Sequence, residues 1–239
     1  MTLIREDPMP HHIAIIMDGN RRYAKEMGLN PLEGHQHGRE KLKEVIEWCL
    51  DVDLKVLTVY AFSTENFKRA QKEVKHLMSL FERNFKILAE DKRVNKYKIR
   101  VRVFGQLDLL PKRVQKSIDT VMAKTKDFDK YYYNMCVAYG GRQEIVDAIK
   151  DIARDVKNGK VPIKKIDEKL VSSYLYTQDV PDPDLIIRTS GEERISNFLL
   201  WQMAYSELYF TDVFWPGMTK IEFLQAIRSF QLRKRRIGT

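Results

Sequence analysis

The chain has 239 residues, of which 44% are hydrophobic and 31% charged, and its formal net charge is +9. This length and composition suit a soluble protein with the core of one α/β domain or of two small ones. No apolar run is long enough to cross a membrane, and the opening MTLIREDPMPHH has no apolar signal region, so we expect a cytoplasmic protein. The two cysteines, Cys49 and Cys136, lack metal-ligand spacing and are predicted to be reduced core thiols.

Two hydrophobic patterns alternate along the chain. Short runs rich in β-branched and aromatic residues, such as HIAIIM, predict buried strands, and apolar residues at helical spacing predict amphipathic helices. In chain order we predict strand 12–17, helix 38–50, strand 55–62, helix 70–93, strand 98–105, helix 112–124, strand 131–140, helix 142–157, strand 184–191, helix 195–205, strand 207–212 and helix 220–236. The alternation predicts one α/β domain over residues 1–239, with a central, mostly parallel sheet of about six strands and helices on both faces.

Polar residues follow several of the predicted strands. In open α/β sheets, ligands bind at the carboxyl ends of the strands, so these positions are the place to look for a site. The exits of the first, second and fifth strands read DGNRR at 18–22, STENFKR at 63–69 and RTSGEERIS at 188–196. The fourth strand ends in a Gly140-Gly141-Arg142 turn that opens a helix, an arrangement that brings backbone N–H groups toward an anion.

The first of these exits places a carboxylate directly before two arginines. Arginine binds phosphate oxygens with two parallel hydrogen bonds, whereas Asp18 alone would repel an anion. Mg²⁺ prefers one or two carboxylates together with substrate phosphates, so Asp18, Arg21 and Arg22 indicate a metal diphosphate. The alternative is that Asp18 caps a helix and the arginines lie on the surface. The other arginine-bearing exits, with Arg69 and with Arg188 and Arg194, favour the site and indicate room for two diphosphates.

Other nucleotide and diphosphate motifs are absent from the sequence. There is no G-x-x-x-x-G-K-[ST] loop and no G-x-G-x-x-G after a strand, which argues against nucleotides as ligands. There is no D-D-x-x-D cluster either. The net charge fits three kinds of partner: nucleic acid, an anionic membrane surface or a phosphorylated small substrate.

Four segments resemble one known family. IAIIMDGNRRYA, YAFSTENFKR, AYGGR and DLIIRTSGEERISNFLLWQMAYSELYFTDVFWP are similar to the cis-prenyltransferases, which include undecaprenyl and dehydrodolichyl diphosphate synthases. The resemblance covers residues from about 12 to 238, and its details are closer to the archaeal and eukaryotic branches than to the bacterial one. It implies a Mg²⁺-dependent polyprenyl diphosphate synthase. Such an enzyme adds isopentenyl diphosphate in cis to an allylic starter, either geranylgeranyl or farnesyl diphosphate, and releases diphosphate.

The resemblance also implies a role for individual residues. Asp18 matches the aspartate that positions Mg²⁺, Glu207 the glutamate that gives the other metal contact, and Asn66 a position often assigned the proton transfer. The allylic diphosphate site is matched by Gly19, Asn20, Arg21, Arg22, Tyr23, His35, Ser63, Thr64, Glu65, Phe67 and Arg69. The isopentenyl diphosphate site is matched by Arg188, Arg194, Ile195, Ser196, Arg236 and Gly238.

Further expectations follow from the same resemblance. The ending Arg236-Ile237-Gly238 matches a motif that reaches across a dimer interface, so we expect a homodimer. An apolar product tunnel is expected because hydrocarbon gains free energy on leaving water, and Leu77, Met78, Leu80 and Phe81 are its candidate lining. A long- or medium-chain product would serve as a glycosyl carrier lipid and bring the protein into peripheral contact with a membrane surface.

Two alternatives remain at this point. Some family members are non-catalytic partner subunits of a heteromeric enzyme, but they typically lose the aspartate that this chain keeps as Asp18. A nucleic-acid-binding protein would explain the charge but not the polar strand exits, so we expect no nucleic-acid partner. The chain also departs from bacterial members at Pro31, Glu193 and Gly217, where an arginine, a histidine and an acidic residue are common.

Overall fold

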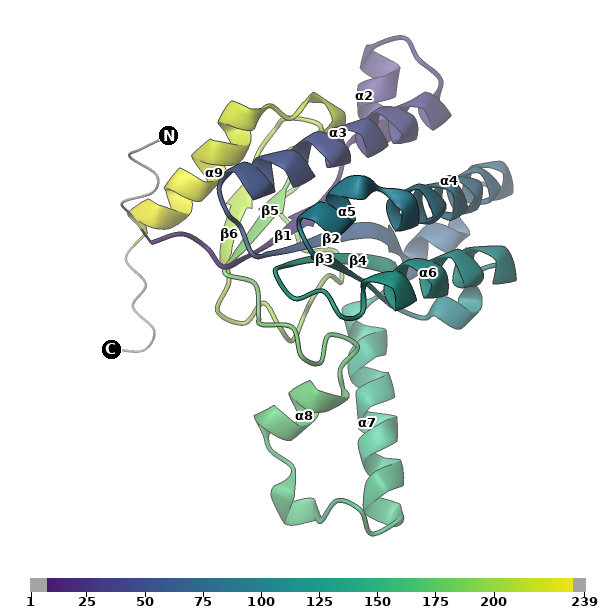
Figure 1. Ribbon diagram of the computed structural model, residues 1–239, viewed down its shortest axis with the longest axis vertical. Helices are drawn as coiled ribbons and strands as arrows, with labels where there is room; N and C mark the ends of the chain where they lie inside the picture. The colour runs from purple at the N-terminus through teal and green to yellow at the C-terminus, as the bar shows by residue number, and fades with distance from the viewer. Residues whose placement is uncertain (1–7, 234–239) are drawn as a thin grey trace.

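The computed structural model describes residues 8–233, and its strands form one sheet in which every pairing is parallel (Figure 1). The order across the sheet is β3-β4-β2-β1-β5-β6. The strands span β1 His12–Ile16, β2 Val56–Ser63, β3 Ile99–Phe104, β4 Tyr131–Tyr139, β5 Leu185–Arg188 and β6 Glu207–Phe210. All six predicted strands are confirmed, and the sheet is parallel throughout the described residues rather than mostly parallel.

Helices connect the strands. Their bounds are α2 Asn20–Glu26, α3 Pro31–Asp51, α4 Gln71–Glu90, α5 Lys92–Lys96, α6 Lys112–Thr125, α7 Gly141–Lys157, α8 Glu168–Tyr174 and α9 Lys220–Leu232, with short 3₁₀ segments η1 Thr64–Lys68, η2 Leu107–Leu109, η3 Ile163–Lys165 and η4 Trp215–Gly217. Helix α3 begins seven residues earlier than predicted because Asn30 and Glu33 form a capping box and Pro31 occupies the first helical position. Within residues 8–233, no helix combines the length and apolar character needed to cross a membrane.

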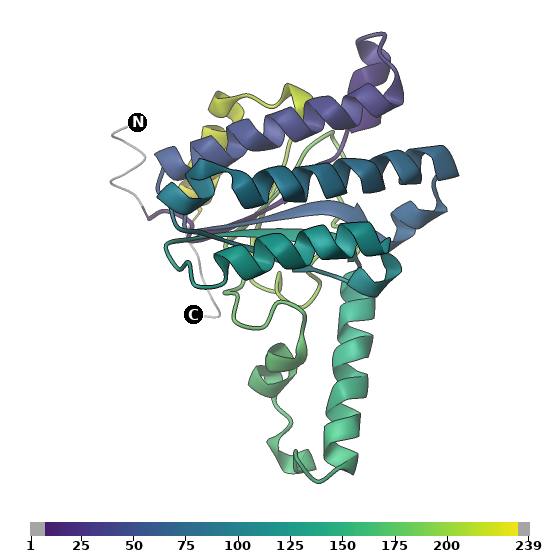
Figure 2. The same ribbon diagram turned by 45° about the vertical axis from the view of Figure 1, so that its right-hand side comes forward.

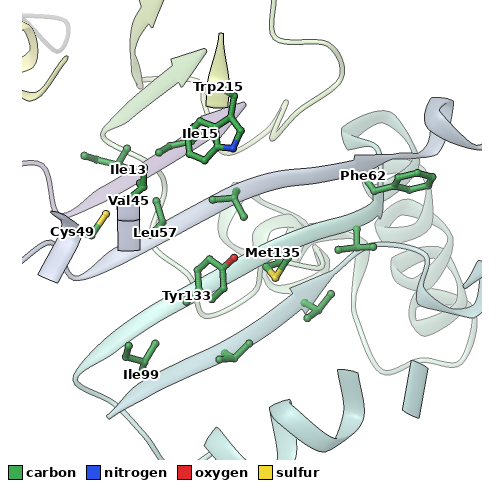
Figure 3. Packing of buried hydrophobic residues seen from close by; sticks show 14 of the residues in the cluster. Ile13, Ile15, Val45, Cys49, Leu57, Phe62, Ile99, Tyr133, Met135 and Trp215 are labelled. Atoms are coloured by element: carbon green, nitrogen blue, oxygen red, sulfur yellow. The ribbon is translucent and has the colours of Figure 1, made fainter. Parts of the chain in front are cut away.

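The larger hydrophobic core lies on one face of the sheet. There, alternate strand residues such as Ile13, Ile15 and Leu57 pack against α3, α4, α6 and α9 (Figures 1 and 3). Cys49 belongs to this core, and Cys136 is buried in the smaller cluster on the other face. Both cysteines are free thiols, as predicted. Burial raises the pKa of both thiols, which keeps them neutral.

The other face of the sheet is covered differently from the prediction. Its cluster includes Ala14, Tyr60 and Ile186, and the covering residues Phe198 and Leu199 come from an irregular segment rather than from a helix. The helix predicted at 195–205 is wrong: Ser196, Asn197 and Leu199 have positive φ angles of 47°, 64° and 42°, which interrupt helical geometry. On this face an irregular segment therefore takes the place of the helix predicted at 195–205.

Helices α7 and α8 project from the body of the molecule (Figures 1 and 2). The first turn of α7 follows β4 at the Gly140-Gly141 turn, and most of the helix extends away from the sheet. Val146 and Ile149 on α7 are 43% and 56% exposed, so this projecting helix presents apolar surface that its own chain leaves uncovered.

Candidate active site

A cavity of about 780 Å³ opens at the carboxyl ends of β2, β1 and β5, which are neighbours in the sheet. Register places Ile16 of β1 opposite Arg188 of β5 and Tyr60 of β2, so the three polar exits meet at one edge. The predicted site residues that line it are Asp18, Gly19, Asn20, Arg21, Arg22, His35, Ser63, Glu65, Asn66, Arg69, Arg188, Arg194 and Ser196. Tyr23, Thr64, Phe67, Ile195 and Glu207 lie outside this lining.

Asp18 is the junction between two of the exits. Its Oδ2 accepts a hydrogen bond from Arg188 Nη2 at 2.8 Å and lies 3.4 Å from Arg22 Nη2. Burial raises the pKa of the Asp18 carboxyl, but Arg188, the Gly19 amide and Arg22 outweigh it, so the net pKa is lowered and the group is ionised. Asp18 does not cap α2, because Gly19 is the N-cap residue and no side-chain cap bond forms; Arg21 and Arg22 are exposed but line the cavity.

The backbone around Asp18 is held by a residue that the sequence analysis missed. The buried Thr189 hydroxyl accepts from the Asp18 N–H at 3.0 Å and donates to the Asp18 carbonyl at 2.7 Å. Gly19 has a φ of 99°, and a Cβ atom there would lie 2.7 Å from the Phe214 ring, so both conformation and space require glycine. The turn therefore fixes Asp18 at the rim of the cavity.

On one side of the cavity, three basic side chains surround a single carboxylate. Arg21 from α2, His35 from α3 and Arg69 after η1 all contact Glu73 in the first turn of α4. Glu73 was not predicted, although its i,i+4 spacing from Arg69 is the kind of pattern that indicates an ion pair. Burial lowers the pKa of His35 more than Glu73 raises it, so the imidazole is neutral at pH 7.

On the other side of the cavity, arginines that follow β1 and β5 lie close together. Arg188 is 5% exposed at its side chain, and its Nη1 donates to Ser196 Oγ at 2.7 Å and to the Arg194 carbonyl. Arg22 donates to the Ser190 carbonyl at 3.1 Å and pairs with Glu192, which also pairs with Arg194. Arg22 therefore joins the β5 exit, although it was predicted among the allylic residues.

The loop after β2 is shaped by its own side chains. Asn66 Oδ1 accepts the Ser63 N–H at 3.1 Å, which closes a capping box with the Ser63 hydroxyl. Glu65 accepts from Asn197 Nδ2 at 3.0 Å, a contact that ties this loop to the β5 exit. Asn66 thus lines the cavity with its amide oxygen already engaged, and a neutral amide is a weak base.

The cavity's charges fit a metal diphosphate. Five arginines and three carboxylates line it, and two diphosphates would outweigh that excess of positive charge, which a divalent cation would offset. Among residues 8–233, no group of three or more His, Cys, Asp or Glu side chains could hold a metal without a substrate. Asp18 is the carboxylate at the arginine junction, and one carboxylate with phosphate oxygens is a donor set that Mg²⁺ accepts.

Glu207 does not meet Asp18 within the described chain. It begins β6 and pairs in register with Leu185, whereas the cavity lies beyond Arg188 at the other end of the strands. Its carboxylate accepts a hydrogen bond from Arg233 Nη1 at 2.6 Å. Arg236 and Gly238 lie outside the described residues, so their predicted contact with isopentenyl diphosphate stays a prediction.

The apolar lining expected for a product is divided between two places. Leu77 lines the polar cavity, and Met78 and Phe81 are buried in the core behind it. A separate cavity of about 160 Å³ lies between α3, α4 and the sheet, with Leu42, Ile46, Phe85, Leu88 and Ile99 in its wall. Apolar space is therefore present between the helices and the sheet, in a cavity separate from the polar one.

Comparisons with known proteins converge on one family. A family model described as putative undecaprenyl diphosphate synthase matches residues 16–238. The tritrans,polycis-undecaprenyl-diphosphate synthase (geranylgeranyl-diphosphate specific) of Methanopyrus kandleri is 54% identical, covering 98% of this chain and 87% of that protein. The protein of the same name from Thermoplasma acidophilum is 53% identical, covering 98% and 91%.

Solved structures agree in fold. Lavandulyl diphosphate synthase from Lavandula x intermedia, in complex with dimethylallyl diphosphate, superposes with a TM-score of 0.92 at 35% identity and covers 97% of this chain and 99% of that one. A probable undecaprenyl diphosphate synthase from Campylobacter jejuni gives 0.78 at 32% identity, covering 97% and 100%.

Proposed function

The chain belongs to the undecaprenyl diphosphate synthase family of cis-prenyltransferases, in its archaeal branch, and on that premise we propose that it elongates geranylgeranyl diphosphate with isopentenyl diphosphate to undecaprenyl diphosphate. Prenyl transfer to an allylic diphosphate is the activity of the family. The choice of starter rests on the names of relatives that are more than half identical over nearly the whole chain. Farnesyl diphosphate is the alternative starter.

The observation that carries the proposal is the contact between Asp18 and Arg188 inside the cavity. It places an ionised carboxylate and a buried guanidinium at the junction of two strand exits. We assign Arg21, His35 and Arg69 to an allylic half of the cavity, and Arg188, Arg194 and Ser196 to an isopentenyl half. Asp18 and Arg22 stand between the halves, where two diphosphates would come closest.

The chemistry needs charge stabilisation at the allylic diphosphate. Breaking the allylic C–O bond leaves extra negative charge on the departing diphosphate, and arginine guanidinium groups positioned beforehand stabilise it. Mg²⁺, which Asp18 would hold, supplies further positive charge when bound. The isopentenyl double bond attacks the allylic carbon and a proton leaves. Asn66 is too weak a base to take that proton alone, so we assign the acceptor role to a diphosphate oxygen.

Three further features belong to the proposal. The whole chain acts as a single catalytic domain, and two copies associate through apolar surface such as that of Val146 and Ile149 on α7. The polyprenyl product brings the cytoplasmic enzyme into contact with a membrane surface and serves as a carrier lipid. Glu207 and the Arg236-Ile237-Gly238 ending contact the metal or isopentenyl diphosphate of a neighbouring subunit.

The alternatives fit the site less well. A non-catalytic partner subunit would not need an ionised Asp18 at the centre of an arginine-lined cavity. Nucleic acid would need unpaired cations on an open surface, whereas Arg22, Arg69, Arg188 and Arg194 are paired with carboxylates at the cavity.

The test is elongation in vitro. Purified protein with Mg²⁺, labelled isopentenyl diphosphate and either geranylgeranyl or farnesyl diphosphate should form undecaprenyl diphosphate, faster from geranylgeranyl diphosphate, as read by chromatography of the dephosphorylated products. Absence of elongation from both starters would contradict the function, and equal rates would contradict the choice of starter.

A further inference from the structure

Glu73 occupies an unusual place beside the cavity. Its side chain is 13% exposed and lies in the first turn of α4, and the residue is not part of the cavity lining. Oε1 accepts hydrogen bonds from Arg69 Nη1 at 2.9 Å and from His35 Nε2 at 3.2 Å, and Oε2 lies 3.7 Å from Arg21 Nη1. All three of these partners line the cavity. The carboxylate therefore stands behind three basic groups that face the site.

The contacts join four separate parts of the chain. Arg21 belongs to α2, His35 to α3, Arg69 follows η1, and Glu73 belongs to α4. Without the carboxylate, the guanidinium groups of Arg21 and Arg69 would repel each other across the space that it fills. His35, 8% exposed at its side chain, would also lose its hydrogen bond to the Glu73 carboxylate. The orientation of the Arg21, His35 and Arg69 side chains thus depends on the single negative charge of Glu73.

The charge state of Glu73 supports this dependence. Burial raises the pKa of its carboxyl, but His35, Arg69 and Arg21 together lower that pKa by more than burial raises it. Glu73 is therefore ionised at neutral pH. A carboxylate only accepts hydrogen bonds, which requires His35 to carry its proton on Nε2 and donate it. The same tautomer leaves Nδ1 of His35 as an acceptor.

We propose that Glu73 is a positioning residue that holds Arg21, Arg69 and His35 in the orientation that receives the diphosphate of the allylic substrate. It acts from outside the cavity and does not touch the substrate. The proposal rests on the proposed function for the identity of the ligand. It predicts that the loss of Glu73 weakens binding of the allylic substrate but not of isopentenyl diphosphate, because the arginines of the isopentenyl half pair with Asp18 and Glu192 instead.

The first experiment compares Michaelis constants. Glu73→Ala should raise KM for geranylgeranyl diphosphate about tenfold and leave KM for isopentenyl diphosphate within about twofold of wild type, with a smaller change in kcat. Glu73→Gln keeps one acceptor oxygen and loses the charge, so its effect should be intermediate. The matched control is Glu82→Ala on the same helix, since Glu82 also pairs with two cations, Lys86 and Arg113, but neither of them lines the cavity.

The second experiment is a double-mutant cycle with Arg69→Ala. If Glu73 acts through Arg69, then Glu73→Ala should raise the allylic KM much less in the Arg69→Ala background than in the wild type. A merely structural role would instead lower stability and raise both Michaelis constants alike, with additive effects. Circular dichroism and urea unfolding show whether each variant is folded, and Glu73→Gln replaces Glu73→Ala in the cycle if the alanine variant does not fold.

The outcomes separate this proposal from the proposed function. An unchanged or lowered allylic KM in Glu73→Ala, with an active wild type, overturns the role of Glu73. Equal rises in both Michaelis constants overturn it as well. If the wild type does not elongate, calorimetric binding of geranylgeranyl diphosphate to wild type, Glu73→Gln and Glu82→Ala still tests the positioning role, and unchanged affinity in Glu73→Gln rejects it.

Discussion

The two halves of the cavity hold their cations in different ways. In the allylic half, Arg21 and Arg69 are backed by Glu73, which lies outside the lining. In the isopentenyl half, Arg188 and Arg194 pair with Asp18 and Glu192, which line the cavity themselves. A ligand in the allylic half therefore meets guanidinium groups that are already oriented. A ligand in the proposed isopentenyl half would displace a carboxylate from an arginine, and displacement of Asp18 from Arg188 would free Asp18 for the proposed metal.

The largest effect is expected at the carboxylate between the halves. Asp18→Ala should lower kcat by about three orders of magnitude, because it removes the residue proposed to place positive charge on the departing diphosphate. The fold should survive, since the Asp18 side chain is 31% exposed at the rim of the cavity. Steady-state kinetics at saturating substrates measure the loss, and turnover near the wild-type rate would reject the metal role. Asp18→Asn, of almost the same shape, is the matched control for the charge.

A second large effect is expected at the C-terminus, in residues outside the described structure. Deleting 236–239 should cut activity about a hundredfold without dissociating a dimer, if Arg236 and Gly238 complete the isopentenyl half of a neighbouring subunit. Activity should return when the truncated chain is mixed with full-length Asp18→Ala, because one mixed site would have both an intact Asp18 and an intact tail. Proven subunit exchange without recovered activity would show that the tail does not act across the interface.

Single arginine substitutions should have smaller effects, and they should distinguish the two halves by which Michaelis constant they raise. Arg194→Ala should raise KM for isopentenyl diphosphate about tenfold more than KM for the allylic substrate, and Arg69→Ala should do the reverse. Arg22→Ala should raise both, since Arg22 contacts Asp18 as well as Ser190 and Glu192. Initial-rate measurements with each substrate varied in turn give the ratio of the two Michaelis constants. Identical ratios for Arg194→Ala and Arg69→Ala would contradict the assignment of separate allylic and isopentenyl halves.

The smallest effect on activity is expected from a group remote from both halves. Burial lowers the pKa of His12, at the start of β1, to about 4, more than the Pro181 carbonyl and Asp184 raise it. Because the folded pKa lies below the ordinary 6.5, the unfolded chain binds more protons between these values, so stability falls as the pH drops from 6.5 to 4, by up to about 3 kcal/mol. Urea unfolding at pH 7 and pH 5 should show this loss, and His12→Gln should reduce it while leaving the ratio of the two Michaelis constants unchanged. An equally steep pH dependence in His12→Gln would assign the loss to other groups.

The strands and most of the cavity lining could be predicted from the sequence because both depend on local patterns. Runs of Ile and Val indicate buried strands, and the rule for strand exits then brings Asp18, Arg69 and Arg188 together. The segment 195–205 could not be predicted in the same way. It is apolar like a helix, yet the Asn197 backbone carbonyl and side chain bond to the Gly141 and Arg142 amides, tertiary contacts that fix a left-handed backbone.

Two other results required the three-dimensional structure. The i,i+4 spacing indicates only the contact of Glu73 with Arg69. Its contacts with Arg21 and His35 come from α2 and α3 packing beside α4, which no spacing along the chain encodes. Glu207 was assigned from the resemblance alone, and only the register of β6 reveals that it lies at the far end of its strand. Which charges face each other is decided by packing between elements, whereas the presence of those charges is evident from the sequence.

The central position of β1 has a consequence for how the protein is made. β1 leaves the ribosome long before β5, yet the two strands pair, and Asp18 meets Arg188 across 170 residues. Closing such distant contacts is slow, because the entropy of a long loop is lost before the contact contributes. A nascent chain that has not yet exposed β5 keeps one side of β1 without a partner strand and has no arginine junction at Asp18. The Asp18–Arg188 junction therefore cannot form until 170 further residues have been synthesised after Asp18.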